Sequence, residues 1–345
     1  MKALVLTAPS TLEIQDVPKP HVSGDDVLVA VQACGICGSD VHGMDGSTGR
    51  RIPPIIMGHE AAGIIAAVGK DVPQWKTGDR VTFDSTIYCG ACTFCKQDRV
   101  NLCEDRRVLG VSCDEYRQHG AFAEYVAVPG RILYRVPDGV PFEHAAMVEP
   151  ISVALHAVTH ASFVPNDCAV VIGAGMIGLL IVQALRVHSY NLIIAVDLDD
   201  SRLALATECG AHVTLNPSRI DVLTAVRART RGLGADAVFE AVGANETVGA
   251  AIQCARKGGA VVLVGNVSAN VQLPLQSVVT REISLFGSCA SSGEYPTCLN
   301  LLQREHVRVA PLISAVASLD DGPEWFRRLH ARERGLMKVI LNPAK

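Results

Sequence analysis

The sequence predicts an α/β protein built on a doubly wound parallel sheet. The first observation is the stretch 168–197, where an apolar run, a glycine cluster, an amphipathic run and a second apolar run follow one another. The second is that apolar runs alternate with helical patterns from there to residue 265. Strands that alternate with helices favour a parallel sheet covered on both faces. The chain has 345 residues, which leaves room for a second domain.

The glycine cluster in 168–197 carries the spacing of a dinucleotide-binding turn. Gly173 permits a tight turn, Gly175 lets the backbone approach a pyrophosphate, and Gly178 lets helix and strand pack closely. Asp197 follows the second strand, at the position where a carboxylate meets the ribose hydroxyls. Glycines at this spacing also occur in ordinary turns, but the flanking strands, helix and acid favour a dinucleotide. The predicted cofactor-binding residues are Gly173, Gly175, Met176, Ile177, Gly178, Asp197 and Arg202.

Composition narrows the range of partners. The chain is 49% hydrophobic and 19% charged, with a formal net charge of −4, so no basic face for nucleic acid is implied. The N-terminus lacks the charged region of a secretory signal, and we expect a cytoplasmic protein. The apolar stretch 168–185 has the hydropathy of a membrane span, but its glycines divide it into strand and helix. We expect no membrane partner.

The first third of the chain reads as β structure. Short apolar or alternating runs are broken by prolines and glycines, which is typical of strands joined by turns. The segment 34–44 is glycine-rich and reads as a loop, and 141–159 reads as a helix with a break at Glu149–Pro150. The predicted strands here are 2–6, 12–16, 26–31, 60–68, one after Gly78–Val81, a pair within 120–130, and 132–136.

The rest of the chain alternates between the two kinds of element. After the strands 168–172 and 192–196, the predicted helices are 199–209, 219–230, 245–256, 293–305 and 322–332. The predicted strands are 212–215, 235–240, 259–265, 281–286 and 337–341.

Four of the twelve cysteines are spaced as C-x2-C-x2-C-x7-C: Cys89, Cys92, Cys95 and Cys103. In a chain without a secretory signal, clustered cysteines more often bind metal than form disulfides. Four thiolates this close can surround one tetrahedral zinc ion. With all four positions filled by protein, this zinc would be structural.

A second metal site is suggested by residues far apart in the sequence. Cys37 lies in the glycine-rich loop, His59 and Glu60 begin a strand, and Glu149 precedes a proline. A catalytic zinc wants about three protein ligands and one open position. Spacing alone does not join these four residues, because each also fits an ordinary core or surface position.

A family resemblance joins them. The motifs are CGICGSDVH (34–42), GHE (58–60), GDRV (78–81), the cysteine quartet, VEP (148–150), GAGMIG (173–178) and AVD (195–197). With these motifs the chain resembles the zinc-dependent medium-chain dehydrogenase/reductase family over nearly its whole length. A glutamate at 149, where the alcohol dehydrogenases of that family have a cysteine, is similar to its polyol branch, which includes galactitol-phosphate dehydrogenases.

The resemblance implies a fold, cofactors and a reaction. It implies a β-rich GroES-like catalytic domain (1–151, rejoined by 287–345) and a Rossmann-type NAD-binding domain (152–286). It implies two zinc ions per chain, a structural one at the quartet and a catalytic one held by Cys37 and His59 with Glu60 or Glu149. It implies hydride transfer from a secondary alcohol of a polyol or polyol phosphate to NAD, in a homotetramer or homodimer. The proton would leave through Ser39 and His42.

Some residues depart from the resemblance. Sorbitol dehydrogenases place an aromatic residue where this chain has Gly43, and an Arg-Tyr pair where it has 287–291. Arg50 and Arg51 are either contacts for a phosphate or a solvated pair, and Lys338 either approaches the cofactor or is solvated. L-threonine or butanediol dehydrogenase is the enzyme alternative. An NAD-binding scaffold or redox sensor and a nucleic-acid-binding zinc ribbon are the non-enzyme ones.

Overall fold

The computed structural model describes residues 1–113, 116–161 and 167–345. The chain folds as two compact units. Unit 1 comprises Met1–Glu149, Tyr295–Arg304 and Val309–Lys345, and unit 2 comprises Pro150–Glu294 and Glu305–Arg308. The sequence predicts domain boundaries after residues 151 and 286, and these boundaries remain a prediction. In the described residues, no helix combines the length and the apolar character needed to cross a bilayer.

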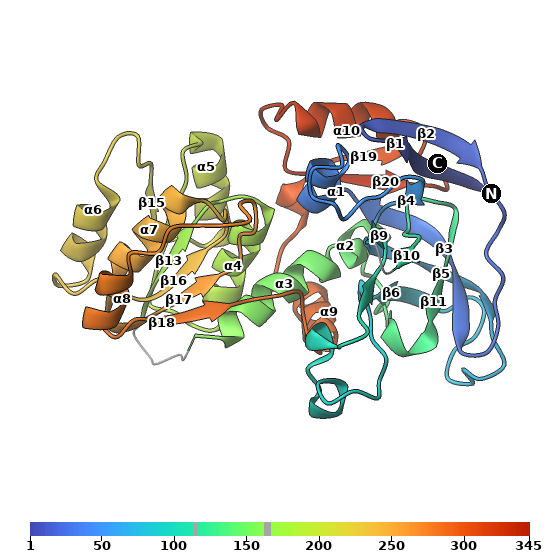
Figure 1. The fold of residues 1–345 in the computed structure, drawn as a ribbon, viewed down its shortest axis with the longest axis horizontal. Helices are drawn as coiled ribbons and strands as arrows, with labels where there is room; N and C mark the ends of the chain where they lie inside the picture. The colour runs from blue at the N-terminus through green and yellow to red at the C-terminus, as the bar shows by residue number, and fades with distance from the viewer. Residues whose placement is uncertain (114–115, 162–166) are drawn as a thin grey trace. The chain divides into compact units, whose positions relative to one another are not determined.

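Unit 1 contains a seven-stranded sheet in the order β12-β6-β5-β3-β20-β19, with β11 paired to β3 (Figure 1). β3 pairs antiparallel with β5 and with β20, while β19 and β20 are parallel. The bounds are β3 (Asp26–Gly35), β5 (Glu60–Val68), β6 (Arg80–Phe83), β11 (Tyr125–Pro129), β12 (Leu133–Arg135), β19 (Ile313–Ser318) and β20 (Lys338–Asn342).

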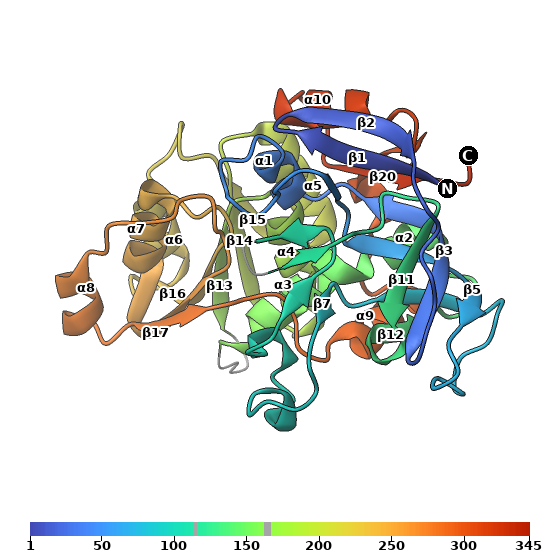
Figure 2. The same cartoon turned by 45° about the vertical axis from the view of Figure 1, so that its right-hand side comes forward.

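Smaller sheets complete the β structure of unit 1. A three-stranded sheet has the order β2-β1-β4, and two short pairs join β7 to β8 and β9 to β10. The bounds are β1 (Lys2–Ala8), β2 (Thr11–Asp16), β4 (Ile55–Ile56), β7 (Thr86–Ile87), β8 (Arg107–Val108), β9 (Val111–Ser112) and β10 (Arg117–Gln118). Both chain ends lie in this unit, close together in both views (Figure 2).

Helices of unit 1 are short and pack on these sheets. In α10, Phe326 is buried and meets Phe122 edge-on, with ring centroids 5.6 Å apart, so the C-terminal part of the chain is fixed to the N-terminal core. The bounds are α1 (Gly38–Gly43), α2 (Phe142–Ala146), α9 (Tyr295–Gln303) and α10 (Gly322–His330), with 3-10 turns at Cys95–Gln97, Val100–Leu102, Gly130–Ile132 and Ala310–Leu312. α3 (Val148–Thr159) begins in unit 1 and continues into unit 2.

Unit 2 is the predicted doubly wound domain. Its six strands are all parallel, in the order β15-β14-β13-β16-β17-β18. The central strand β13 is buried along its whole length, as expected for a strand covered on both faces. The strands are β13 (Cys168–Ile172), β14 (Leu192–Val196), β15 (Val213–Leu215), β16 (Ala235–Glu240), β17 (Ala255–Leu263) and β18 (Ser284–Gly287). The helices are α4 (Met176–Val187), α5 (Asp200–Cys209), α6 (Val222–Arg229), α7 (Asn245–Cys254) and α8 (Leu275–Thr280).

The predicted fold class is confirmed, with local differences. Residues 120–130 contain the single strand β11 in place of the predicted pair, and the helix predicted over 141–159 is interrupted at Met147 and not at Glu149–Pro150, which lie inside α3. The glycine-rich segment predicted as a loop contains the short helix α1, because Cys37 and Asp40 form a capping box at its start. Strand β19 and helix α8 were not predicted. β19 has a mixed burial pattern and α8 has no buried residue, so neither shows a clear hydrophobic period in the sequence.

Candidate functional site

Three of the four predicted ligands of the catalytic metal come together in unit 1. Cys37 precedes α1, His59 lies just before β5, and Glu60 is the first residue of β5. One side-chain atom from each lies within 4.8 Å of the other two. His59 and Glu60 are buried and Cys37 is partly buried. A thiol, an imidazole and a carboxylate at this separation form a donor set that fits zinc.

The strand register explains why Glu60 has room in this cluster. Glu60 on β5 is paired with Gly35 on β3, and a Cβ atom at position 35 would overlap the Glu60 carboxylate. On the other side of β3 runs β20, whose first residue is Lys338. Of the predicted alternatives for Lys338, the solvated side chain is wrong, and the cofactor contact stays a prediction. Lys338 is buried and its Nζ donates to Glu60 Oε2 at 2.5 Å.

The Glu60–Lys338 pair is a buried ion pair. Burial opposes the charged form of Lys338, but the adjacent Glu60 carboxylate outweighs this and raises the lysine pKa. Nζ also donates to the carbonyl oxygen of Ile36 at 3.1 Å, next to Cys37 in the chain. Lys338 therefore connects two segments that carry candidate ligands.

Asp40 forms a second buried charge beside the cluster. Its side chain is fully buried, and Oδ1 lies 3.5 Å from His59 Nδ1 and 2.9 Å from Arg51 Nη2. Burial opposes its ionisation, yet His59 and Arg51 hold the pKa of Asp40 well below its usual range. The pKa of His59 is raised because Asp40 and Cys37 together overcome the effect of burial.

Glu149, at the second position of α3, lies outside the group of three. Its Oε1 accepts a hydrogen bond from Ser85 at 3.2 Å. Burial, with Glu60 and Asp84 adding negative charge, raises its pKa to about 7 against the opposing effect of His59. The charges of the cluster therefore shift the pKa of Glu149, although Glu149 is not among the three residues whose ligand atoms lie within 4.8 Å of one another.

The two predicted proton-relay residues are both on α1. Ser39 and His42 are exposed, which suits a path between the cluster and solvent. The Ser39 hydroxyl accepts a hydrogen bond from Arg51 at 3.4 Å. The predicted solvated pair of arginines is therefore wrong for Arg51, which is buried, while Arg50 is exposed.

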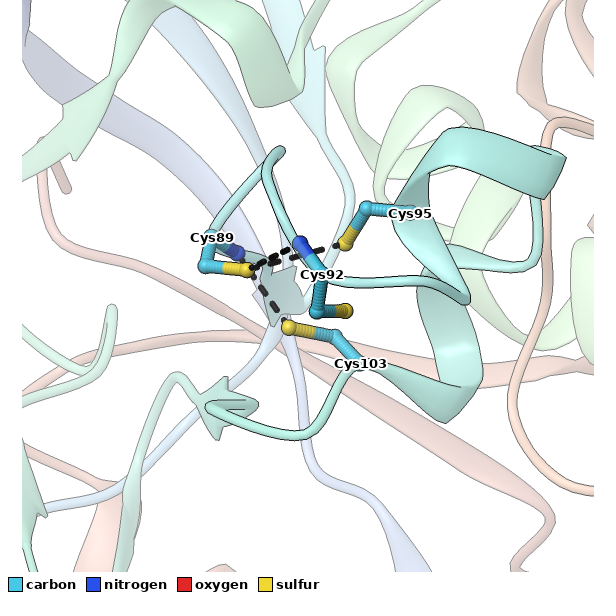
Figure 3. Close-up of side chains that lie close together, drawn as sticks. All are labelled: Cys89, Cys92, Cys95 and Cys103. Atoms are coloured by element: carbon cyan, nitrogen blue, oxygen red, sulfur yellow. Dashed lines mark hydrogen bonds between the residues drawn. The ribbon is translucent and has the colours of Figure 1, made fainter.

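The cysteine quartet is assembled in unit 1 as a separate cluster. Figure 3 shows the four sulfur atoms turned toward one space, and all lie within 4.8 Å of one another. Cys89 Sγ lies 3.9 Å from Cys95 Sγ. Thiolates about 2.3 Å from one zinc ion would be roughly 3.8 Å apart in a tetrahedron, so these cysteines fit the ion.

Backbone N–H groups prepare part of this cluster for a metal. Those of Cys95 and Glu104 lower the pKa of Cys92 to about 6, and that of Cys92 donates to Cys89 Sγ at 3.4 Å (Figure 3). Burial raises the pKa of Cys95 to about 12. A thiol with a raised pKa is protonated at neutral pH, and a metal that binds its sulfur displaces the proton to solvent. Metal binding here therefore releases protons.

The dinucleotide turn in unit 2 has the predicted form. Gly173 has φ +95°, and a Cβ on Gly178 would overlap its carbonyl oxygen, so both glycines are needed for the turn itself. Gly175 differs, since a Cβ there would meet no atom within 4 Å. Gly175 is also the N-cap of α4, with no side-chain hydrogen bond to the first N–H groups. This open, donor-rich position fits a pyrophosphate.

Asp197 follows β14 directly beside this turn, because Val196 pairs with Ile172 in the sheet. Its carboxylate accepts from the backbone N–H groups of Ala174 at 2.7 Å and Asp199 at 2.9 Å. Arg202, a predicted cofactor-binding residue, has its Nη1 3.9 Å from Asp197 Oδ2. Met176 and Ile177 form the first turn of α4.

Sequence reasoning missed the side chains that surround the ligands. Asp40 lies inside a quoted motif but was given no role, and Lys338 and Arg51 were left between alternatives. The signal for Lys338 is a lysine at the head of an otherwise apolar run, MKVIL, where a charge is retained only with a partner. No comparable pattern marks Arg51 in the sequence.

Comparisons with known proteins agree with this site. The family model described as "Alcohol dehydrogenase GroES-like domain" matches residues 23–138, and that described as "Zinc-binding dehydrogenase" matches residues 177–304. Sorbitol dehydrogenase of Bacillus subtilis is 33% identical over 99% of this chain and 97% of its own length. D-arabitol-phosphate dehydrogenase of Enterococcus avium is 33% identical over 95% of this chain and 93% of its own.

A solved structure is similar over the whole chain. It is a protein of Sinorhizobium meliloti described as a zinc-binding dehydrogenase and bound to NADP, with a TM-score of 0.92, 32% identity and 99% coverage of both chains. The chain belongs to the zinc-dependent medium-chain dehydrogenase/reductase family and to its polyol dehydrogenase branch. It is a zinc-dependent oxidoreductase with a nicotinamide dinucleotide as cofactor, as the sequence predicted.

Proposed function

We propose that this member of the zinc-dependent dehydrogenases oxidises a secondary hydroxyl of a polyol or polyol phosphate and passes the hydride to NAD, giving a ketose. The observation that carries the proposal is the meeting of Cys37, His59 and Glu60 within 4.8 Å at the family's motif positions. The similarity to sorbitol and D-arabitol-phosphate dehydrogenases supports the substrate class.

The proposed ligands of the catalytic zinc are Cys37 and His59, with a carboxylate from Glu60 or Glu149. Bound there, zinc would lower the pKa of a coordinated hydroxyl. Glu60 forms a buried ion pair with Lys338 and Glu149 accepts a hydrogen bond from Ser85, so either carboxylate would exchange a partner for the zinc ion. A change of the Glu149 side chain from Ser85 toward the cluster would complete the set.

Ser39 and His42 are the proposed proton path. Ser39 accepts the proton of the substrate hydroxyl while passing its own onward, and the exposed His42 delivers it to solvent. Replacing His42 with Gln should lower turnover at neutral pH while zinc content stays the same. Full activity of this variant would exclude His42 from the path.

The cysteine quartet is the proposed structural zinc site. Its four thiolates leave no position for substrate, and its sulfur separation fits tetrahedral coordination. Two zinc ions per chain are therefore expected. Elemental analysis of the purified protein that finds only one would remove one of the two sites.

NAD is the proposed cofactor rather than NADP. Asp197, with Asp199 and Asp200 after it, puts negative charge where NADP carries its 2′-phosphate. Arg202 is beside Asp197 and is partly neutralised by it. The similar structure from Sinorhizobium meliloti was solved with NADP, so the preference needs a direct test. A higher kcat/KM with NADP than with NAD would overturn it.

The decisive experiment follows NAD reduction with a panel of polyols, polyol phosphates, vicinal diols and L-threonine. We expect turnover of one polyol class that is lost on chelation and restored by zinc. Turnover of threonine or butanediol alone would replace the proposed substrate. Binding of NAD without turnover of any member would contradict the proposed reaction.

A homodimer or homotetramer assembled through unit 2 is also proposed. β18 is the edge strand of the parallel sheet, and apolar side chains are exposed on it and around α8: Val267, Leu275, Val279 and Phe286. An apolar surface beside a free strand edge favours association with a second copy. Light scattering that gives a monomer mass at micromolar concentration would contradict this. A cytoplasmic location remains the prediction from the sequence.

A further inference from the structure

Arg51 is the buried cation whose role the proposed reaction does not explain. Its side chain is only 4% exposed, while the neighbouring Arg50 is exposed. A guanidinium is retained inside a protein only where it is paired and hydrogen-bonded. The partners of Arg51 therefore show what it does.

The two side chains that Arg51 contacts belong to α1, which follows Cys37 directly. Nη2 donates to Asp40 Oδ1 at 2.9 Å and to Ser39 Oγ at 3.4 Å. Nη1 donates to the carbonyl oxygen of Arg50 at 3.1 Å, which anchors the guanidinium to its own backbone. Arg51 thus contacts a buried carboxylate and the hydroxyl of the proposed proton path.

Asp40 in turn contacts both non-carboxylate ligands of the proposed zinc site. Its Oδ1 lies 3.5 Å from His59 Nδ1, and its Oδ2 accepts from the backbone N–H of Cys37 at 3.4 Å. One carboxylate is therefore shared between the segments that carry Cys37 and His59. Of the contacts made by Asp40, that to Arg51 is the shortest, so Arg51 sets the position of the carboxylate.

Gly43 provides the room for this arrangement. A Cβ atom at position 43 would lie 2.8 Å from Arg51 Cγ and 3.3 Å from Thr48 Oγ1. Any larger side chain would therefore push the arginine stem away from Asp40. The absence of a side chain at position 43 and the burial of Arg51 are two parts of one local structure.

We propose that Arg51 is a positioning residue that holds Asp40 against His59 and Cys37 and orients the Ser39 hydroxyl. This inference rests on the proposed zinc site. A carboxylate that accepts from the free nitrogen of a metal-bound histidine fixes the ring orientation, and loss of such a partner costs about 10- to 100-fold in metal affinity or activity. Arg51 acts one step further out, through Asp40.

The test measures zinc release to an excess of a chromogenic chelator. Arg51→Gln is compared with wild type and with Arg50→Gln, which removes the same charge from the exposed neighbouring position. We expect release from the catalytic site to be about 10-fold faster in Arg51→Gln and unchanged in Arg50→Gln. Zinc in the cysteine quartet serves as an internal reference, because its release should not change.

Two further variants keep the test valid if Arg51→Gln does not fold. Arg51→Lys keeps the charge, so its zinc release should be slower than that of Arg51→Gln. Gly43→Ala keeps Arg51 but displaces its side chain, so its zinc release should be faster than that of wild type. Cobalt substituted at the catalytic site should show a changed visible spectrum in Gly43→Ala. Release and spectra equal to wild type in both variants would overturn the inference.

A double-mutant cycle tests whether Arg51 acts through Asp40. In an Asp40→Asn background, Arg51→Gln should add little to the release rate, whereas an undiminished effect would overturn the proposed connection. Failure of the proposed zinc site would be seen in a different measurement, because wild-type protein would then bind zinc only in the quartet. If wild type holds two zinc ions and Arg51→Gln releases both at wild-type rates, the positioning role alone is wrong.

Discussion

The two metal clusters of unit 1 are built in opposite ways. The quartet takes all its ligands from one 15-residue segment, Cys89 to Cys103, in which two 3-10 turns connect Cys95 to Cys103. The catalytic cluster takes Cys37 from the segment before α1 and the adjacent His59 and Glu60 from the start of β5, and Lys338 reaches it from the far end of the chain. The first can form whenever its own loop closes, and the second only when the sheet has formed.

The clusters also differ in what surrounds them. Backbone N–H groups stabilise the thiolates of the quartet. The catalytic cluster is flanked by two buried ion pairs, Glu60–Lys338 and Asp40–Arg51. The difference supports the proposal that the quartet is structural and that the other cluster is catalytic, where buried charges would hold the ligands in fixed orientations.

The largest effect should come from removing a ligand of the catalytic cluster. Cys37→Ser should lower turnover by more than about 100-fold, because losing a ligand costs more than losing a partner of a ligand. The zinc content should fall from two ions per chain to one, with little change in Tm. Turnover and elemental analysis measure both, and retained activity with two zinc ions would remove Cys37 from the site.

Breaking the quartet should have the reverse profile. Cys103→Ser should destabilise the protein by more than about 4 kcal/mol, as expected when a structural metal is lost. Turnover per catalytic zinc in the folded fraction should change little. Thermal unfolding and activity are compared with Cys289→Ser, which alters an exposed cysteine outside both clusters. Loss of activity without loss of stability would mean that the quartet is not structural.

Removing Lys338 tests the buried charges of the catalytic cluster. Lys338→Met leaves Glu60 buried without its cation and should cost about 3–5 kcal/mol of stability. The double variant with Glu60→Gln should recover much of this, because no charge then lacks a partner. Denaturant unfolding measures both, with Lys257→Met as an exposed control. Equal destabilisation in the two backgrounds would mean that the ion pair is not the cause.

The smallest expected effect is a pH dependence in the metal-free protein. A carboxyl group whose pKa is higher in the folded than in the unfolded state stabilises the fold while it is protonated. This contribution is lost as the pH rises from the unfolded-state pKa to the folded-state pKa. Glu149, with a pKa raised from 4.5 to about 7, should therefore lower stability between pH 4.5 and 7.

Glu149→Gln should remove that fall. In domains of roughly 150–250 residues, each 1 kcal/mol of that fall would appear as a decrease of about 2–4 °C in Tm. Thermal unfolding of both metal-free proteins at pH 5, 6, 7 and 8 measures the difference, which should disappear when zinc is restored. Identical pH profiles for the two metal-free proteins would contradict the raised pKa.

The sequence predicted what depends on local spacing. Gly173, Gly175, Gly178 and Asp197 are found where the spacing placed them, and the four cysteines converge on one point. The alternation of strands and helices predicted the parallel sheet of unit 2. In the glycine turn and the quartet, residues close together in the sequence make the contacts, so the pattern contains the geometry; the sheet follows from the repeated alternation of its elements.

Tertiary structure decided what depends on strand pairing between distant segments. That β20 runs beside β3, and so places Lys338 against Glu60, follows from the order of strands in the sheet, which no local pattern encodes. The burial of Arg51 depends on α1 and on the space left at Gly43. The sequence by itself determined the family, the fold class and the candidate ligands. Only the folded chain decided which charges surround them, because a buried charge is stable only beside a partner that the fold supplies.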